Sequence, residues 1–439
     1  MFRQLPLGLF SGLAIVVLFA TGGPVLAQLE FERQPILYSR AMPRDSIARL
    51  KAELESGQVE LSYDKEHGYL PALLKYANVP TSSQVLVFSK TSLQRHNISP
   101  RTPRALYFND DTYIGWVQNG DVVEISTAEP TLGGVFYTLD QRNQQDAVIT
   151  RKTDQCLVCH ASTHTERVPG HIMRSVYVEK SGLPIFSMGT HRTNDASPFQ
   201  RRWGGWYVTG THGSQRHMGN ELTLRTAANA EDLDREAGAN VSKLDDRLTV
   251  SRYLTEHSDI IALMVLGHQV NMHNRLTAAN YSGQFTGRDT EVMNRVLERP
   301  KGFESDSAKR RYASAAKKVV NCLLMVGEYD FNTPIRGTSA FATEFTARGP
   351  FDTRGRSLRQ LDLQRRLFRY PCSFLIYSPS FDRLPARVLA DVYHRLWAVL
   401  TNENQSHEFS HLTPADRRAI LEILVDTKQG LPAYWQIAD

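Results

Sequence analysis

The sequence predicts an α+β fold, because strand patterns dominate its first part and helix patterns dominate its last part. Between residues 84 and 139, short runs alternate between apolar and polar residues, which is the period of a half-buried strand. From about residue 250 onward, apolar residues recur every three or four positions, which is the period of an amphipathic helix. Of the 439 residues, 41% are hydrophobic and 22% are charged, the composition of a globular protein. We expect a β-rich N-terminal half and a mainly helical C-terminal half.

The first 27 residues have the pattern of an export signal. One positive charge, Arg3, precedes an apolar run over residues 5–20, and Val25-Leu26-Ala27 offers small residues at a cleavage site. The run is short for a membrane span and is followed by glycines and a proline. We expect residues 1–27 to be a signal peptide that is removed, with a retained membrane anchor as the alternative. No later stretch is long and apolar enough to span a bilayer, so we expect no membrane span in the mature chain.

The region over residues 28–150 is expected to form two short helices followed by strands. Ile47, Leu50 and Leu54 have helical spacing, and Asn119-Gly120 between two strand patterns predicts a tight hairpin turn. The predicted helices cover residues 44–55 and 68–77, and the predicted strands cover residues 84–88, 105–108, 113–117, 121–126 and 134–139.

The region over residues 151–439 is expected to begin with strands and to end with helices. The last helix has the clearest start, with Thr413 as cap, Pro414 at the first position and Asp416 at the capping-box position. The predicted strands cover residues 174–178 and 183–188, a strand and a glycine-rich loop cover residues 203–213, and the helices cover residues 259–276, 306–328, 384–400 and 413–427. Exposed polar connections are expected over residues 283–301 and 337–360.

Residues 156–160, with the sequence Cys-Leu-Val-Cys-His, form the C-x-x-C-H pattern at which c-type haem is attached. Two thiols one turn apart can add to the two vinyl groups of haem, and the adjoining His160 can reach the iron as proximal ligand. A zinc half-site and a thioredoxin-like dithiol are the alternatives, but the sequence has no second C-x-x-C pair to complete a zinc site. The sequence therefore predicts one covalent haem c, held by Cys156, Cys159 and His160. Because bacteria attach such haem after export, the motif agrees with the signal peptide and predicts a periplasmic protein.

The helix predicted over residues 259–276 offers the first candidate for the second axial ligand of the iron. It is apolar almost all round, which is typical of a buried helix, yet His268, Asn271 and Arg275 share one side. A polar stripe on a buried helix needs a partner, and haem would supply one, with His268 at the iron and Arg275 at a propionate. A core histidine bonded to a carbonyl or to Asn271 is the alternative. His273 points to another side and is a weaker candidate.

The glycine-punctuated loop over residues 211–220 offers further distal candidates. His217 is the second choice after His268, and His212 and Met218 are weaker candidates. Loops that carry this much ligand chemistry are often functional. The alternative is a hydrogen-bonded turn that packs on Trp203.

Two groups of residues near these candidates have less specific patterns. His164, His171 and His191 follow the motif in polar segments, where we expect surface positions or local hydrogen bonds. Cys322 and Cys372 lie among apolar residues, so a buried pair of free thiols and a disulfide both remain open.

The charge distribution argues against nucleic-acid binding. The formal net charge is only +5, and no basic stripe with interleaved aromatic residues occurs. We expect the short basic runs at residues 201–202 and 309–311 to be solvated faces of the protein.

Four stretches together carry a resemblance to a known family. They are residues 156–160, 202–220, 258–275 and 369–385. Over these stretches the chain resembles an uncharacterised family of large exported bacterial c-type cytochromes with a single haem. Residues 412–421 are similar to the closing helix of small cytochromes c, which in those proteins packs against the motif helix.

The motif, the signal peptide and the resemblance together favour a periplasmic c-type cytochrome with one haem that acts in electron transfer. We therefore expect a redox partner protein in the periplasm. The alternative is a haem enzyme, peroxidase- or oxygenase-like, in which the distal position of the iron is open or weakly filled.

Overall fold

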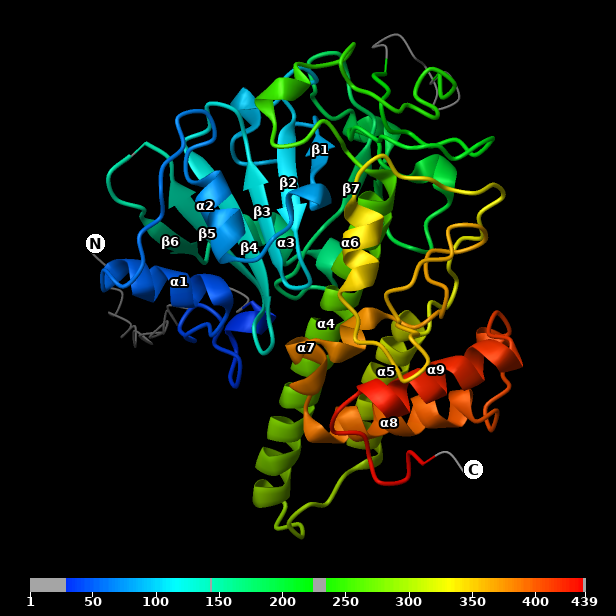
Figure 1. The fold of residues 1–439 in the computed structure, drawn as a ribbon. Helices are drawn as coiled ribbons and strands as arrows, with labels where there is room; N and C mark the ends of the chain where they lie inside the picture. The colour runs from blue at the N-terminus through cyan, green and yellow to red at the C-terminus, as the bar shows by residue number, and fades with distance from the viewer. Residues whose placement is uncertain (1–28, 143, 224–233, 437–439) are drawn as a thin grey trace, which may run out of the picture.

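A computed structural model describes residues 29–142, 144–223 and 234–436, and it has the predicted α+β architecture. The expected signal peptide, residues 1–27, lies outside the described residues. A β-rich N-terminal half is followed by a helical C-terminal half, and the long helix α4 runs between them (Figure 1).

The N-terminal half is built on a six-stranded antiparallel sheet in which each strand pairs with the next one along the chain. The predicted strands are confirmed as β1 to β5, and β6 is an additional strand that the sequence pattern missed. The hairpin predicted at Asn119-Gly120 joins β3 to β4. The strands are β1 (Val85–Val87), β2 (Arg104–Phe108), β3 (Thr112–Trp116), β4 (Val122–Glu129), β5 (Gly133–Asp140) and β6 (Ile149–Lys152).

The two faces of this sheet contribute to two different cores. One face, with Ile114 and Ile125, packs with the helices α1 (Ser46–Glu55) and α2 (Leu70–Tyr76) in what we call the sheet core. The opposite face presents Tyr113 to α4 and to the helical core, which is built mainly from the C-terminal half. Because both faces are covered, every residue of β3 is buried.

The helical core forms around α4, which is much longer than predicted. Gly283 lies within this helix, where the first turn of α8 approaches so closely that an added Cβ would lie 2.8 Å from Pro385. The connection expected over residues 283–301 is therefore helical as far as Val296, because glycine at position 283 serves helix packing, whereas residues 291–301 are largely exposed as expected. The helices are α4 (Ile260–Val296), α5 (Asp306–Leu323), α6 (Phe341–Ala347), α7 (Pro379–Asp382), α8 (Ala386–Leu400) and α9 (Pro414–Thr427).

Three further sequence expectations need correction. The expected strand over residues 183–188 ends in a 3₁₀ turn (Phe186–Met188), and β7 (Arg174–Val176) pairs with β8 (Thr190–Arg192) instead. The expected strand from residue 203 makes only isolated bridges to three separate segments. The expected connection over residues 337–360 contains α6, whose Phe341 and Phe345 are buried in the helical core.

The closing helix α9 has the predicted cap, in which Thr413 and Asp416 satisfy each other's backbone N–H groups. It packs on α8, and its buried residues belong to the helical core. The motif helix α3 (Gln155–His160) contributes Leu157 to the sheet core instead. The packing of α9 against the motif helix, which the resemblance to small cytochromes c implies, is therefore not found in this structure.

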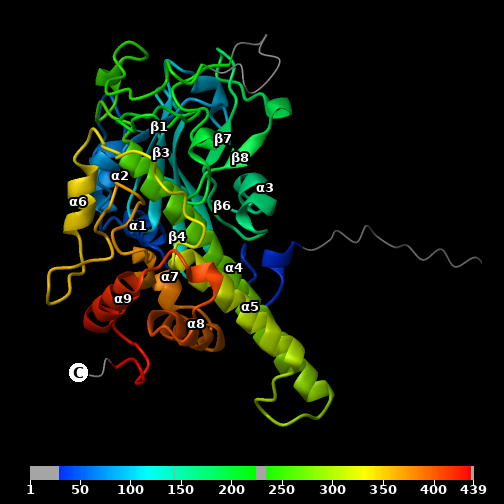
Figure 2. The same ribbon diagram turned by 90° about the vertical axis from the view of Figure 1, so that its right-hand side faces the viewer.

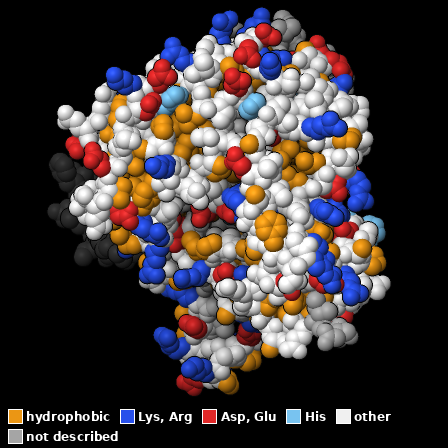
Figure 3. Space-filling view, viewed as in Figure 1, with side chains coloured by type: hydrophobic (Ala, Val, Ile, Leu, Met, Phe, Trp, Pro, Cys, Tyr) orange, Lys and Arg blue, Asp and Glu red, His pale blue; other side chains and the backbone are white. Residues whose placement is uncertain are grey.

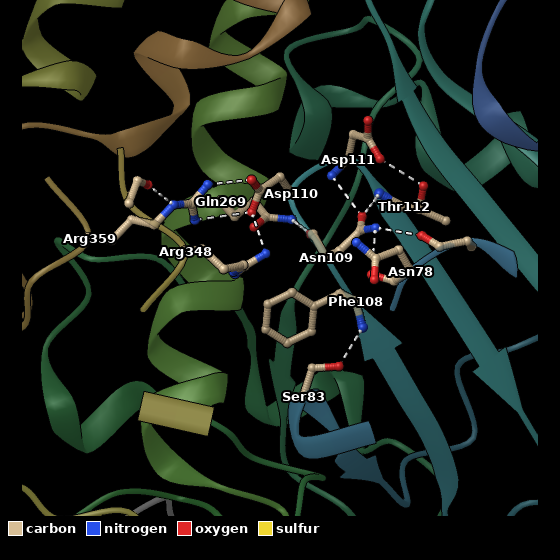
Figure 4. Close-up of polar contacts among 12 residues, drawn as sticks. Asn78, Ser83, Phe108, Asn109, Asp110, Asp111, Thr112, Gln269, Arg348 and Arg359 are labelled. Carbon is tan, nitrogen blue, oxygen red and sulfur yellow. Dashed lines mark hydrogen bonds and ion pairs between the residues drawn. The ribbon is translucent and has the colours of Figure 1, made fainter. Parts of the chain in front are cut away.

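A charged clamp joins the two halves at the turn between β2 and β3. Asp110 accepts hydrogen bonds from Arg348 at 3.0 Å and from Arg359, which is itself buried under Phe374 (Figure 4). Gln269 of α4 donates to the carbonyl of the neighbouring Asn109 at 2.7 Å. The turn thus holds α4 and the C-terminal half against the end of strands β2 and β3.

Across the described ranges, no helix combines the length and the apolar character that crossing a bilayer requires. On the face shown in Figure 3, acidic and basic side chains are interspersed.

Candidate functional site

The motif helix α3 follows directly after β6 in the chain (Figure 2). It carries both motif thiols. Leu157 anchors the helix in the sheet core, whereas Val158 is 79% exposed. Cys156 and Cys159 are both free thiols, the first partly buried and the second exposed. Residues three apart share one side of a helix, so the two thiols can react with one ligand. Burial, assisted by the charge of Glu124, raises the pKa of the Cys156 thiol to about 11.

His160 is oriented by a single hydrogen bond to the backbone. Its Nδ1 lies 2.9 Å from the carbonyl oxygen of Gly170, so Nδ1–H is the donor. This bond leaves the Nε2 lone pair for a metal, the usual arrangement of a ligating histidine. The Phe136 ring packs against the imidazole, with a distance of 4.8 Å between the two ring centroids. Burial lowers the pKa of His160, which favours the neutral form that binds a metal.

The loop that follows α3 is built to hold the His160 backbone. The carbonyl oxygen of His160 accepts hydrogen bonds from Gly170 N at 2.8 Å and from Thr165 Oγ1 at 3.2 Å. The loop in turn packs on the start of β5, where Gly134 donates to the Pro169 carbonyl at 2.8 Å. A Cβ at Gly134 would lie 2.9 Å from Gly170 N, so only glycine permits this approach.

Charged and apolar side chains surround the motif helix. Arg104 and Glu124, from β2 and β4, form an ion pair at 2.5 Å and act electrostatically on His160. Arg174 of β7 also acts electrostatically on His160. Its guanidinium covers the ring of Phe186, which is largely exposed. Arg104 and Arg174 are the residues near His160 that could neutralise propionates.

The donor set fits a covalent haem. Two free thiols, one imidazole with an open Nε2 and adjacent exposed apolar side chains are what thioether attachment and proximal ligation require. In the described ranges, His, Cys, Asp and Glu form no group of three or more that could hold a bare metal ion. Haem is different, because its own four nitrogens need only one or two ligands from the protein.

The chain was compared with protein-family models, with curated proteins and with solved structures, and no match was found in any of the three.

The structure places the first distal candidate, His268, within the helical core. Its Nε2 lies 2.7 Å from Ser373 Oγ, and its Nδ1 lies 3.7 Å from a carboxylate oxygen of Asp195. All three side chains are buried, so this serine–histidine–aspartate arrangement has no opening for a substrate. Both ring nitrogens of His268 therefore face protein groups.

Arg275, expected at a propionate, instead forms an ion pair with Glu166 at 2.7 Å. Glu166 lies in the loop that follows the motif helix. The pair thus connects α4 to the loop that follows His160.

The three candidate ligands in the loop over residues 211–220 are also buried. The Nδ1 of His212 donates to the Gln215 carbonyl at 2.8 Å, and its Nε2 accepts from Asn240 N at 3.0 Å. His217 is 2% exposed and accepts from Gly219 N through Nδ1, while its Nε2 has no hydrogen-bond partner. Met218 is buried as well, with its sulfur 3.8 Å from Ser175 Oγ.

Sequence reasoning missed a buried group of rings near His160. His171, expected at the surface or in a local hydrogen bond, is 5% exposed, and neither of its ring nitrogens has a hydrogen-bond partner. Its ring lies 4.4 Å from that of Tyr113, whose hydroxyl lies 2.8 Å from His273 Nδ1. Val168, Pro169 and Gly170 before His171 are apolar and were the available signal of burial.

Cys322 and Cys372 are both buried as free thiols. Asn271 of α4 lies 3.5 Å from the sulfur of Cys322, and burial raises the pKa of both thiols. In this structure they serve as small core residues.

Proposed function

We propose that this protein is a periplasmic c-type cytochrome that carries one covalent haem and acts in electron transfer. The observation that carries the proposal is the geometry of α3, where two free thiols adjoin an imidazole whose Nδ1 is engaged by Gly170. When bound, haem supplies an iron that accepts and releases one electron at a time.

The surrounding residues would position the haem and set its environment. The hydrogen bond from His160 to Gly170 holds the imidazole orientation, and Phe136 excludes water behind it. On the outer side, Val158 and Phe186 are exposed apolar side chains that a haem plate would cover. A haem at this position lies near the surface, where a periplasmic redox partner can approach.

The proposal is tested by haem attachment in a host that matures c-type cytochromes. The expected intact mass is that of the processed chain plus one haem, and the double variant C156A/C159A should lose the added mass entirely. The variant C322A/C372A is the matched control, because it removes the two cysteines of the helical core and should keep the haem. A purified, folded parent without added mass would refute the proposal.

A haem enzyme is the second candidate, and one observation favours it. Both nitrogens of His268 and of His212 already face protein groups, so neither ring stands ready as a strong second ligand. An open distal position would let a small molecule reach the iron. A high-spin resting spectrum that changes on adding cyanide would favour the enzyme, and a low-spin spectrum that does not change would favour electron transfer.

A further inference from the structure

The helices α4 and α5 run antiparallel beside each other (Figure 2). Their side chains, together with Glu166 of the loop that follows the motif helix, line an open pocket of about 310 Å³. Small side chains on both helices leave this space open. They are Ala278, Ala279 and Ser282 on α4, and Ser307, Ser314 and Ala315 on α5.

Cationic side chains dominate the lining of the pocket. Arg275, Arg310, Arg311 and Lys318 contribute four positive charges, and Glu166 contributes the one carboxylate. Arg275 is engaged by Glu166 at 2.7 Å, and Arg311 lies 3.4 Å from Asp289. Within the described part of the chain, Arg310 and Lys318 have no ion-pair partner. The pocket therefore holds an excess of positive charge that its own residues do not balance.

We propose that this pocket binds a small anion that carries several carboxylate or phosphate oxygens. Arg310 and Lys318 supply unpaired charges, and guanidinium groups make strong, directional bonds to such oxygens. The serine hydroxyls of both helices add donors at the pocket wall. The volume lies at the lower end of the range for small-molecule sites, which suits an ion of a few carbon atoms better than a large ligand.

The bound anion competes with Glu166 for Arg275. Glu166 and Arg167 both have left-handed backbone conformations, with φ of 59° and 64°, so the loop bends sharply to bring this carboxylate to Arg275. The same loop supplies Thr165 and Gly170, which hold His160. An anion at Arg275 thus acts on the loop segment that orients His160. Binding of the anion does not itself require haem.

Isothermal titration calorimetry of the full-length purified protein tests the site, with citrate and inorganic phosphate as separate probes in an anion-poor buffer. Saturable binding of either probe supports the proposal, and the stronger probe identifies a polycarboxylate or a phosphate site. The double variant R310Q/K318Q should weaken binding at least about tenfold, because it removes two charge-assisted contacts. Both residues are exposed, so the fold should tolerate the change.

The matched control is K309Q/R295Q, which removes the same charge from exposed positions of α5 and α4 outside the pocket lining. It should weaken binding by less than about threefold, as expected of a screened long-range effect. E166Q should tighten binding, because it frees Arg275. Absence of heat with both probes, an equal loss in the two double variants, or weaker binding by E166Q would overturn the proposal. Anion binding by a parent protein that a host able to mature c-type cytochromes produces without haem would leave this proposal standing while refuting the cytochrome.

Discussion

Two histidine-bearing segments of this protein, residues 155–170 and 211–220, differ in where their ring nitrogens point. The Nδ1 of His160 donates a hydrogen bond to the Gly170 carbonyl in its own segment, and its Nε2 remains available. His212 uses both nitrogens within the protein, and His217 is enclosed by aromatic rings. Both segments contain the residue types that bind metals. The difference teaches that a ligand site depends on an unoccupied atom with access, and not on residue type alone.

Helix α4 repeats this contrast along its own length. His268 faces Asp195 and Ser373 in the helical core, whereas His273 faces Tyr113 on the sheet. Five residues rotate a helix by roughly 140° beyond a full turn, because each residue adds about 100°. The helix therefore directs its two histidines to different elements of the fold, one to the C-terminal half and one to strand β3 of the sheet.

The largest expected effect separates the two histidine-bearing segments. His160→Ala should abolish the native absorption spectrum of the bound haem completely, because the proximal ligand is lost while both thioether cysteines remain. His212→Gln should leave the spectrum unchanged, since that ring bonds only to the protein. Visible spectroscopy of equal amounts of haem protein provides the measurement, and an altered spectrum in the His212 variant would show that the loop contacts the haem.

The clamp that holds α4 between the two cores is expected to give the next largest effect. Asp110→Ala should lower the free energy of unfolding by about 4 kcal/mol, because it leaves the buried Arg359 without its carboxylate partner. Arg348→Ala removes a more exposed partner of the same carboxylate and should cost less than about 1 kcal/mol. Urea unfolding of both variants checks this order, which equal losses would contradict.

The sheet-facing histidine of α4 should make stability depend on pH. Burial lowers the pKa of His273 to about 4, below its ordinary value near 6.5. The unfolded chain therefore binds a proton in this range that the folded chain does not. This contribution to stability is complete above pH 6.5 and is lost as the pH falls toward 4, by about 3 kcal/mol.

His273→Gln provides the measurement of that contribution. The slope of the unfolding free energy against pH between 4.5 and 6 reports how many more protons the unfolded chain binds than the folded chain. In the variant this number should be smaller than in the parent by about one proton. An unchanged slope would show that His273 is not the group responsible.

The smallest effect tests His268, the opposite side of the same helix. His268→Ala should lower the unfolding free energy by about 2 kcal/mol, because Asp195 and Ser373 lose a buried partner. The haem spectrum should stay that of the parent. A change of spin state would instead support His268 as the distal ligand, as the sequence pattern predicts.

The elements that follow from local patterns were predictable, and those that depend on distant contacts were not. The capping box at Thr413 and the alternation in β1 to β5 are local signals, and the structure confirms both. The continuation of α4 through Gly283 depends on Pro385, which packs against the glycine from about a hundred residues away. β6 likewise forms a strand because it pairs with β5, and its own sequence has no alternating pattern that predicts one.

The candidate site divides in the same way. The sequence by itself determined the C-x-x-C-H pattern on which the haem proposal rests, because the spacing of two thiols and a histidine over five residues is local chemistry. It also determined the α+β division, because the two hydrophobic periods differ. Only the tertiary structure decided which ring nitrogens remain available. The partners of His268, His171 and Arg275 come from other elements, and their hydrogen bonds and packing exist only after the chain has folded.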